Sequence, residues 1–148
     1  MHDFRHHTKT VEGVHWHWVE CGEGDPVVLL HGIPESWQCW RHQMPKLATQ
    51  FRVLAFDLKG YGQSDKSEGD YTANNVAREL IQCLDAIGID KFRLAGHDWG
   101  VMIADNVIDQ IRTGSSATSA VACRSTHMTP DGPCTTSGIR KIRKPPLA

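Results

Sequence analysis

The chain has 148 residues, a length typical of one domain. It contains 16 Lys and Arg residues against 17 Asp and Glu residues, so its net charge of -1 lacks the basic excess of a nucleic-acid-binding protein. No apolar run reaches the length of a membrane span, and the polar first residues hold no apolar signal-peptide block. We therefore expect a cytoplasmic protein with neither a nucleic-acid nor a membrane partner.

The cysteines and histidines predict no metal site and no cofactor. The cysteine number is odd and the spacings are wide, without a Cys-x-x-Cys pair, at Cys21, Cys39, Cys83, Cys123 and Cys134. This pattern excludes a disulfide scaffold and a zinc ribbon, and indicates free thiols in a reducing compartment. His15 and His17 share one face of an expected strand, but no third ligand accompanies them, so we interpret both as exposed strand positions.

The composition of the chain changes near residue 108. Every Phe, Trp and Tyr lies at or before Trp99, whereas the last 40 residues contain 18 Gly, Ser, Thr or Pro and carry a net charge of +4. Such a segment buries too little apolar surface to offset its ordering entropy. We predict a partial domain at 1–108 and a disordered or aberrant basic tail at 109–148. The basic run at 140–144 is solvated in this interpretation; the alternative is that it touches an acidic partner or a nucleic acid.

Strand and helix patterns alternate before the break. The sequence predicts strands at 14–19, 27–30, 52–56 and 91–95. It predicts a helical stretch from Ser36 to Leu47 that Pro45 kinks or restarts, an amphipathic helix from Thr72 to the stop at Gly88, and a helix from residue 99 to about 111. Beyond Ile111 we expect neither strand nor helix. The alternation indicates an α/β fold with parallel strands, whose ligand site lies at the carboxyl ends of those strands.

Two of these strand ends carry a recognisable motif. Gly96-His97-Asp98-Trp99-Gly100 joins a strand to a helix and has the form of a nucleophile elbow, with Asp98 at the nucleophile position. The earlier buried strand ends at His31-Gly32-Ile33-Pro34. In this architecture the backbone N–H groups of Ile33 and Trp99 form an oxyanion hole beside Asp98.

The segment from about Gly13 to Ala104 resembles the N-terminal half of an α/β-hydrolase, of the epoxide hydrolase and haloalkane dehalogenase group. The resemblance rests on Val28–Trp37, Trp40–Gln43, Asp57–Lys66 and Gly96–Gly100. It implies an α/β-hydrolase fold with a mostly parallel sheet, flanking helices and, here, an irregular C-terminal tail. Ile33 has no side-chain donor for a halide, which favours epoxide over organohalide as the small-molecule substrate.

The resemblance also implies a two-step reaction without a cofactor. Asp98 attacks an epoxide carbon and forms an alkyl-enzyme ester, and water then hydrolyses this ester to a diol, with the oxyanion held by Ile33 and Trp99. Trp99 also contacts substrate. Trp37 either lines the substrate pocket or belongs to the core, and Asp57 fixes its own loop.

Several parts of the family's machinery have no counterpart in this chain. No cap, catalytic acid or catalytic His follows the elbow, since His127 lies in the irregular tail, and Tyr61 and Tyr71 both precede the nucleophile. We expect a truncated, inactive hydrolase that traps substrate, with an exposed strand edge at 91–95 open to self-association. The alternatives are a haloalkane dehalogenase relative, and a non-enzymatic truncated product or binding module.

Overall fold

A computed structural model describes residues 3–114, 119–124 and 140–141. The elements in chain order are β1 (Arg5–Val11), β2 (Val14–Cys21), β3 (Pro26–Leu30), η1 (Trp37–Trp40), α1 (Met44–Leu47), β4 (Arg52–Asp57), α2 (Ala73–Ala86), β5 (Lys91–Gly96), α3 (Trp99–Arg112), β6 (Ser119–Arg124) and β7 (Arg140–Lys141). All four predicted strands are present, within two residues of the predicted ends. No helix of the described segments is long and apolar enough to cross a bilayer.

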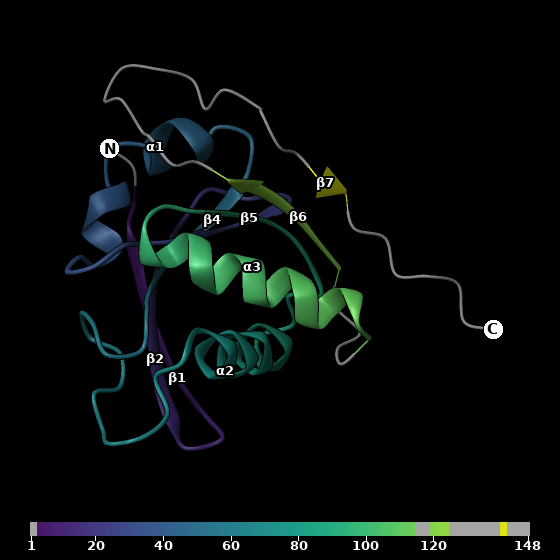
Figure 1. Ribbon diagram of the computed structural model, residues 1–148. Coiled ribbons are helices and arrows are strands. Elements are labelled where there is room, and N and C mark those ends of the chain that lie inside the picture. The colour runs from purple at the N-terminus through teal and green to yellow at the C-terminus, as the bar shows by residue number, and fades with distance from the viewer. Residues whose placement is uncertain (1–2, 115–118, 125–139, 142–148) are drawn as a thin grey trace.

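The strands form one mixed sheet in the order β1-β2-β4-β3-β5-β6-β7. Its centre is parallel, because β3 pairs with both β4 and β5, as expected of strands joined by helical crossovers. The first two strands make an antiparallel hairpin that joins the edge of β4. Helices α2 and α3 lie side by side on one face of the sheet (Figure 1). The predicted α/β architecture is confirmed.

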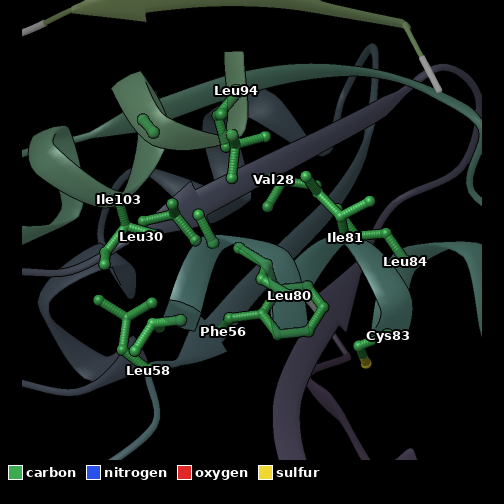
Figure 2. Packing of buried hydrophobic residues seen from close by; sticks show 14 of the residues in the cluster. Val28, Leu30, Phe56, Leu58, Leu80, Ile81, Cys83, Leu84, Leu94 and Ile103 are labelled. Carbon is green, nitrogen blue, oxygen red and sulfur yellow. The ribbon is translucent and has the colours of Figure 1, made fainter. Parts of the chain in front are cut away.

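The two faces of the sheet pack against two separate apolar clusters. Along β3, Val28 and Leu30 face α2 and α3, whereas Val27 and Leu29 face η1 and α1. This alternation follows from the two-residue period of a strand, and it explains why β3 is apolar on both faces. Figure 2 shows the larger cluster, in which Leu80 of α2 lies beside Phe56 of β4.

The helices begin where the sequence predicts them. The Thr72 side chain accepts a hydrogen bond from the Asn75 backbone N–H and so caps α2, which ends before Gly88. Ser36 caps η1 in the same way, through Gln38. The predicted stretch from Ser36 to Leu47 forms two short helices, and of the two outcomes predicted for Pro45 the structure has the restart, since α1 begins at Met44 with Pro45 in its first turn.

Three expectations differ from the structure. Strand β1 was not predicted, because its exposed polar residues show no apolar alternation. Strands β6 and β7 lie beyond Ile111, where we expected none. Strand β6 pairs along the whole of β5, so the predicted exposed edge of β5 is wrong, and self-association of the chain stays a prediction. An open edge leaves N–H and C=O groups without partners, and a short strand of Ala, Val and Cys is sufficient to satisfy them.

The expected exposure of His17 is also wrong. His17 is only 1% exposed, because the loop after β4 covers it. Its backbone N–H donates to Ser64 Oγ, and its ring Nδ1 lies 2.7 Å from Asp57 Oδ2. The division of the chain at residue 108 stays a prediction, although α3 itself continues to Arg112.

Helix α3 approaches β3 closely at Gly100, which gives a test of the fold. A Cβ atom at Gly100 would lie 2.3 Å from the Leu30 carbonyl oxygen. Ala favours a helix over Gly by about 1 kcal/mol, but overpacking against backbone costs about 1–3 kcal/mol or more. We expect Gly100→Ala to lower the free energy of unfolding by about 2 kcal/mol in urea, measured by tryptophan fluorescence.

Gly69→Ala is the matched control. A Cβ there would meet only Lys59 Nζ, at 3.7 Å, so we expect a change within about 0.5 kcal/mol. Equal unfolding midpoints for the two variants would contradict the close approach of α3 to β3.

Candidate active site

The turn between β5 and α3 holds Asp98 in an unusual backbone conformation. Asp98 has φ 50° and ψ -122°, and it is the N-terminal cap of α3. Positive φ in a residue with a side chain costs of order 1–3 kcal/mol and occurs mainly at functional sites. The glycines on either side make this turn possible, because a Cβ at Gly96 would lie 2.6 Å from the Gly100 carbonyl oxygen. The turn presents an exposed carboxylate at the carboxyl end of the sheet.

Two backbone N–H groups converge on one oxygen of Asp98. The N–H of Ile33 donates to Asp98 Oδ2 at 3.0 Å, and the N–H of Trp99 donates to the same oxygen at 2.6 Å. The first donor comes from the loop after β3, and the second from the first residue of α3. The structure therefore brings together the three residues predicted as catalytic, and their catalytic roles remain proposals.

The loop after β3 is held close to Asp98 by its own hydrogen bonds. The Glu35 backbone N–H donates to the Gly32 carbonyl at 3.0 Å, and the Glu35 carboxylate accepts from the Gly32 N–H at 3.0 Å. The Ile33–Pro34 peptide bond in this loop is cis. A Cβ at Gly32 would lie 2.6 Å from Asp98 Cβ, so only glycine permits this approach.

Two histidines beside the site have structural partners. His31 is buried, and its Nδ1 donates to the Gly32 carbonyl at 2.8 Å while its Nε2 accepts from the Leu58 N–H at 2.9 Å. Burial lowers the pKa of His31, which keeps its ring neutral. His97 Nε2 lies 2.8 Å from Glu35 Oε2. Both histidines thus brace the two loops.

The two tryptophans of the predicted substrate site lie in different surroundings. Trp99 is partly buried against the larger apolar cluster. The Trp37 ring packs edge-on against Phe4 and His6, with centroid distances of 5.6 and 5.4 Å. The Trp37 backbone N–H donates to Asp57 Oδ1 at 2.8 Å. Substrate binding by Trp37 and Trp99 stays a prediction.

Asp57 fixes the end of β4 and the loop that follows it. Its Oδ2 accepts from the Gln63 N–H at 2.9 Å and faces His17, whose other ring nitrogen lies 3.0 Å from His6 Nδ1. Sequence reasoning missed this His6–His17–Asp57 chain, and it also missed the pairing of Glu35 with His97. His127 and most of the basic run at 140–144 lie outside the described residues.

Comparison with known proteins shows the family to which this chain belongs. The family model described as "alpha/beta hydrolase fold" matches residues 25–132, and the chain belongs to this family. Epoxide hydrolase 2 of Siraitia grosvenorii is 41% identical over 107 residues, which cover 70% of this chain and 34% of the relative. A soluble epoxide hydrolase of Corynebacterium sp. (strain C12) is 40% identical over 102 residues, covering 69% of this chain and 36% of the relative.

Solved structures of epoxide hydrolases share the fold. The structure of the epoxide hydrolase CorEH without ligand superposes with a TM-score of 0.72 and 33% identity, over 82% of this chain and 43% of that one. The epoxide hydrolase VrEH1 of Vigna radiata superposes with a TM-score of 0.71 and 30% identity, over 84% and 39%. The chain spans about a third of the length of the curated relatives it matches.

The hydrogen bonds to Asp98 predict how its carboxyl group titrates. The N–H groups of Ile33 and Trp99 stabilise the anion and lower the pKa of Asp98 below its ordinary 3.8. Because the folded-state pKa is the lower one, this stabilisation is present above the unfolded pKa and is lost as the pH falls through the folded pKa. We expect the Asp98 carboxyl carbon to titrate in NMR at a lower pH in the folded chain than in the urea-unfolded chain.

Gly32→Ala is the informative variant for this titration. Its added Cβ pushes the loop away from Asp98, so the carboxyl pKa should rise toward 3.8, whereas Gly69→Ala should leave it unchanged. An Asp98 midpoint equal to or above that of the unfolded chain would show that the two N–H groups do not converge on the carboxylate.

Proposed function

We propose that this chain carries the nucleophile and the oxyanion hole of an epoxide-hydrolase-type reaction. The observation that supports this most directly is the position of Asp98 Oδ2, within 3.0 Å of the Ile33 N–H and 2.6 Å of the Trp99 N–H. The similarity to proteins named epoxide hydrolases supports the same chemistry. The chain spans only about a third of the length of those relatives. The proposal therefore rests on the geometry of the site in this chain and not on the activity of the whole enzymes.

In the first step, Asp98 Oδ1 attacks a saturated ring carbon of the epoxide. Among the described residues, the hydrogen bonds to this carboxylate all go to Oδ2, which leaves Oδ1 as the attacking oxygen. The new C–O bond forms as the ring C–O bond breaks, and its electron pair goes to the epoxide oxygen, which takes a proton from water. A carboxylate with a lowered pKa is ionised at neutral pH and needs no base to attack.

In the second step, water attacks the carbonyl carbon of the resulting ester. The carbonyl oxygen of this ester is Oδ2, so the negative charge of the tetrahedral intermediate develops on the oxygen that the two N–H groups already hold. Loss of one such donor typically lowers the rate by about 10²–10³-fold. Collapse of the intermediate releases a diol and restores Asp98.

The second step also needs a base to activate the water. Of the described histidines, the two beside the site are occupied, His31 by Gly32 and Leu58 and His97 by Glu35. We therefore propose that this chain by itself forms the alkyl-enzyme ester much faster than it hydrolyses the ester. It then behaves as a covalent trap for the epoxide.

The trap has a direct test by intact-protein mass spectrometry. Incubation with styrene oxide should add the mass of one epoxide to the chain, and peptide mapping should place it on Asp98. Asp98→Asn should give no adduct at this position. Asp90→Asn, which removes an exposed carboxylate directly before β5, should react like the parent chain.

Three outcomes would contradict parts of this proposal. A cooperatively folded chain without an Asp98 adduct would overturn the nucleophile, and would favour a binding module. Steady formation of many diols per chain would overturn the trap. An adduct from a haloalkane with release of halide, and none from the epoxide, would make the chain a dehalogenase relative instead.

A further inference from the structure

Three side chains of metal-ligand type, from two loops and one short helix, meet beside the site. Glu35 comes from the loop after β3, Cys39 from η1, and His97 from the turn between β5 and α3. One ligand atom of each lies within 4.8 Å of the others. We propose that Glu35, Cys39 and His97 bind a divalent transition-metal ion of the zinc class, with water as a further ligand. This site does not depend on the proposed hydrolase activity.

The donor set selects the class of ion. A thiolate, an imidazole and a carboxylate are the three protein ligand types of Zn²⁺, and three protein ligands with an open position are a common zinc arrangement. Mg²⁺ and Ca²⁺ prefer oxygen ligands, and a set with sulfur and nitrogen does not suit them. Co²⁺ binds similar sites and makes the coordination visible in an absorption spectrum.

The backbone of each ligand is already fixed. The Glu35 N–H is bonded to the Gly32 carbonyl, the Cys39 N–H to the Ser36 carbonyl at 3.1 Å, and the His97 N–H to the Leu30 carbonyl at 3.3 Å. The His97 ring also packs edge-on against the buried Trp40 ring, with the centroids 5.5 Å apart. Little backbone ordering is therefore required when an ion binds.

The Glu35 carboxylate accepts a hydrogen bond from a residue that is not itself a ligand, as the ligands of bound metals usually do. Its Oε2 accepts from the Gly32 N–H at 3.0 Å, and such hydrogen bonds orient carboxylate ligands. The same oxygen lies 2.8 Å from His97 Nε2, so in the ion-free chain the two ligands hold each other in place. A bound ion replaces this contact and links the loop after β3 to the nucleophile turn.

The ion must also displace the proton of Cys39. Burial, together with the nearby Glu35 and Asp57 carboxylates, raises the pKa of the Cys39 thiol to about 12, while Arg41 opposes this rise. Metal ligation by cysteine requires the thiolate, so affinity is measured under mildly alkaline conditions.

The test is a titration of the full chain with Co²⁺ at constant pH. We expect one ion per chain, with a thiolate-to-cobalt charge-transfer band in the near ultraviolet that Zn²⁺ abolishes. Cys39→Ser should remove this band. Glu35→Gln and His97→Gln should each weaken binding by at least the roughly 10–100-fold that loss of an outer partner causes.

The charge-transfer band distinguishes this site from others in the chain. Cys83→Ala removes a buried thiol of the α2 core and should leave the band intact, and urea melts establish that every variant is folded. Absence of the band in the parent chain would overturn the proposal. Its persistence in folded Cys39→Ser, or full affinity in both the Glu35→Gln and the His97→Gln variants, would do so as well.

Discussion

The close approach of α3 to the end of β3 is the constraint on which the site depends. No side chain fits at Gly100, because its Cβ would lie 2.3 Å from the Leu30 carbonyl oxygen and 2.8 Å from that of His31. At the same place the His97 N–H donates to the Leu30 carbonyl. This contact sets the height of the helix N-terminus over the sheet. It thereby sets the distance between Asp98 and the N–H of Ile33.

The polar contacts around the turn all serve this same arrangement. His31 ties the end of β3 to Leu58 after β4, and Glu35 ties the loop after β3 to His97. Asp57 ties β4 to the start of η1 through Trp37. His31, Glu35 and Asp57 each have specific partners, which favours one arrangement of these loops and keeps the two N–H donors on one oxygen. The result is an exposed Asp98 carboxylate with a lowered pKa, as the proposed nucleophile requires.

Much of this could be predicted from local patterns. Apolar runs gave the strands at the sheet centre, the spacing of Leu80 and Leu84 with the Thr72 cap gave α2, and glycines at two strand ends gave the nucleophile turn. The prediction of strands failed where strand formation depends on pairing with residues far apart in the sequence. Exposed β1 shows no apolar alternation, and the pairing of β6 depends on the open edge of β5.

Local sequence also fails to predict the burial of His17 and the pairing of Glu35 with His97. Both depend on loops that meet only in the folded chain, 40 and 62 residues apart in sequence respectively. The strand pattern predicts the same exposure for His15 and His17, since both point to one face of the strand. Of these two histidines, the segment at residues 57–64 buries only His17. The residues next to His17 in the sequence do not predict this burial.

The amide resonances of Ile33 and Trp99 give the most direct test of the central claim, that both N–H groups bond to Asp98 Oδ2. In ¹H–¹⁵N spectra at neutral pH, Asp98→Asn replaces a charged acceptor by a weaker neutral one. The amide protons of both residues should then move upfield, while Asp90→Asn should leave them in place. Ile33 is decisive because it lies 65 residues from Asp98. A change at Trp99 alone, with the Ile33 amide unmoved, would contradict the oxyanion hole.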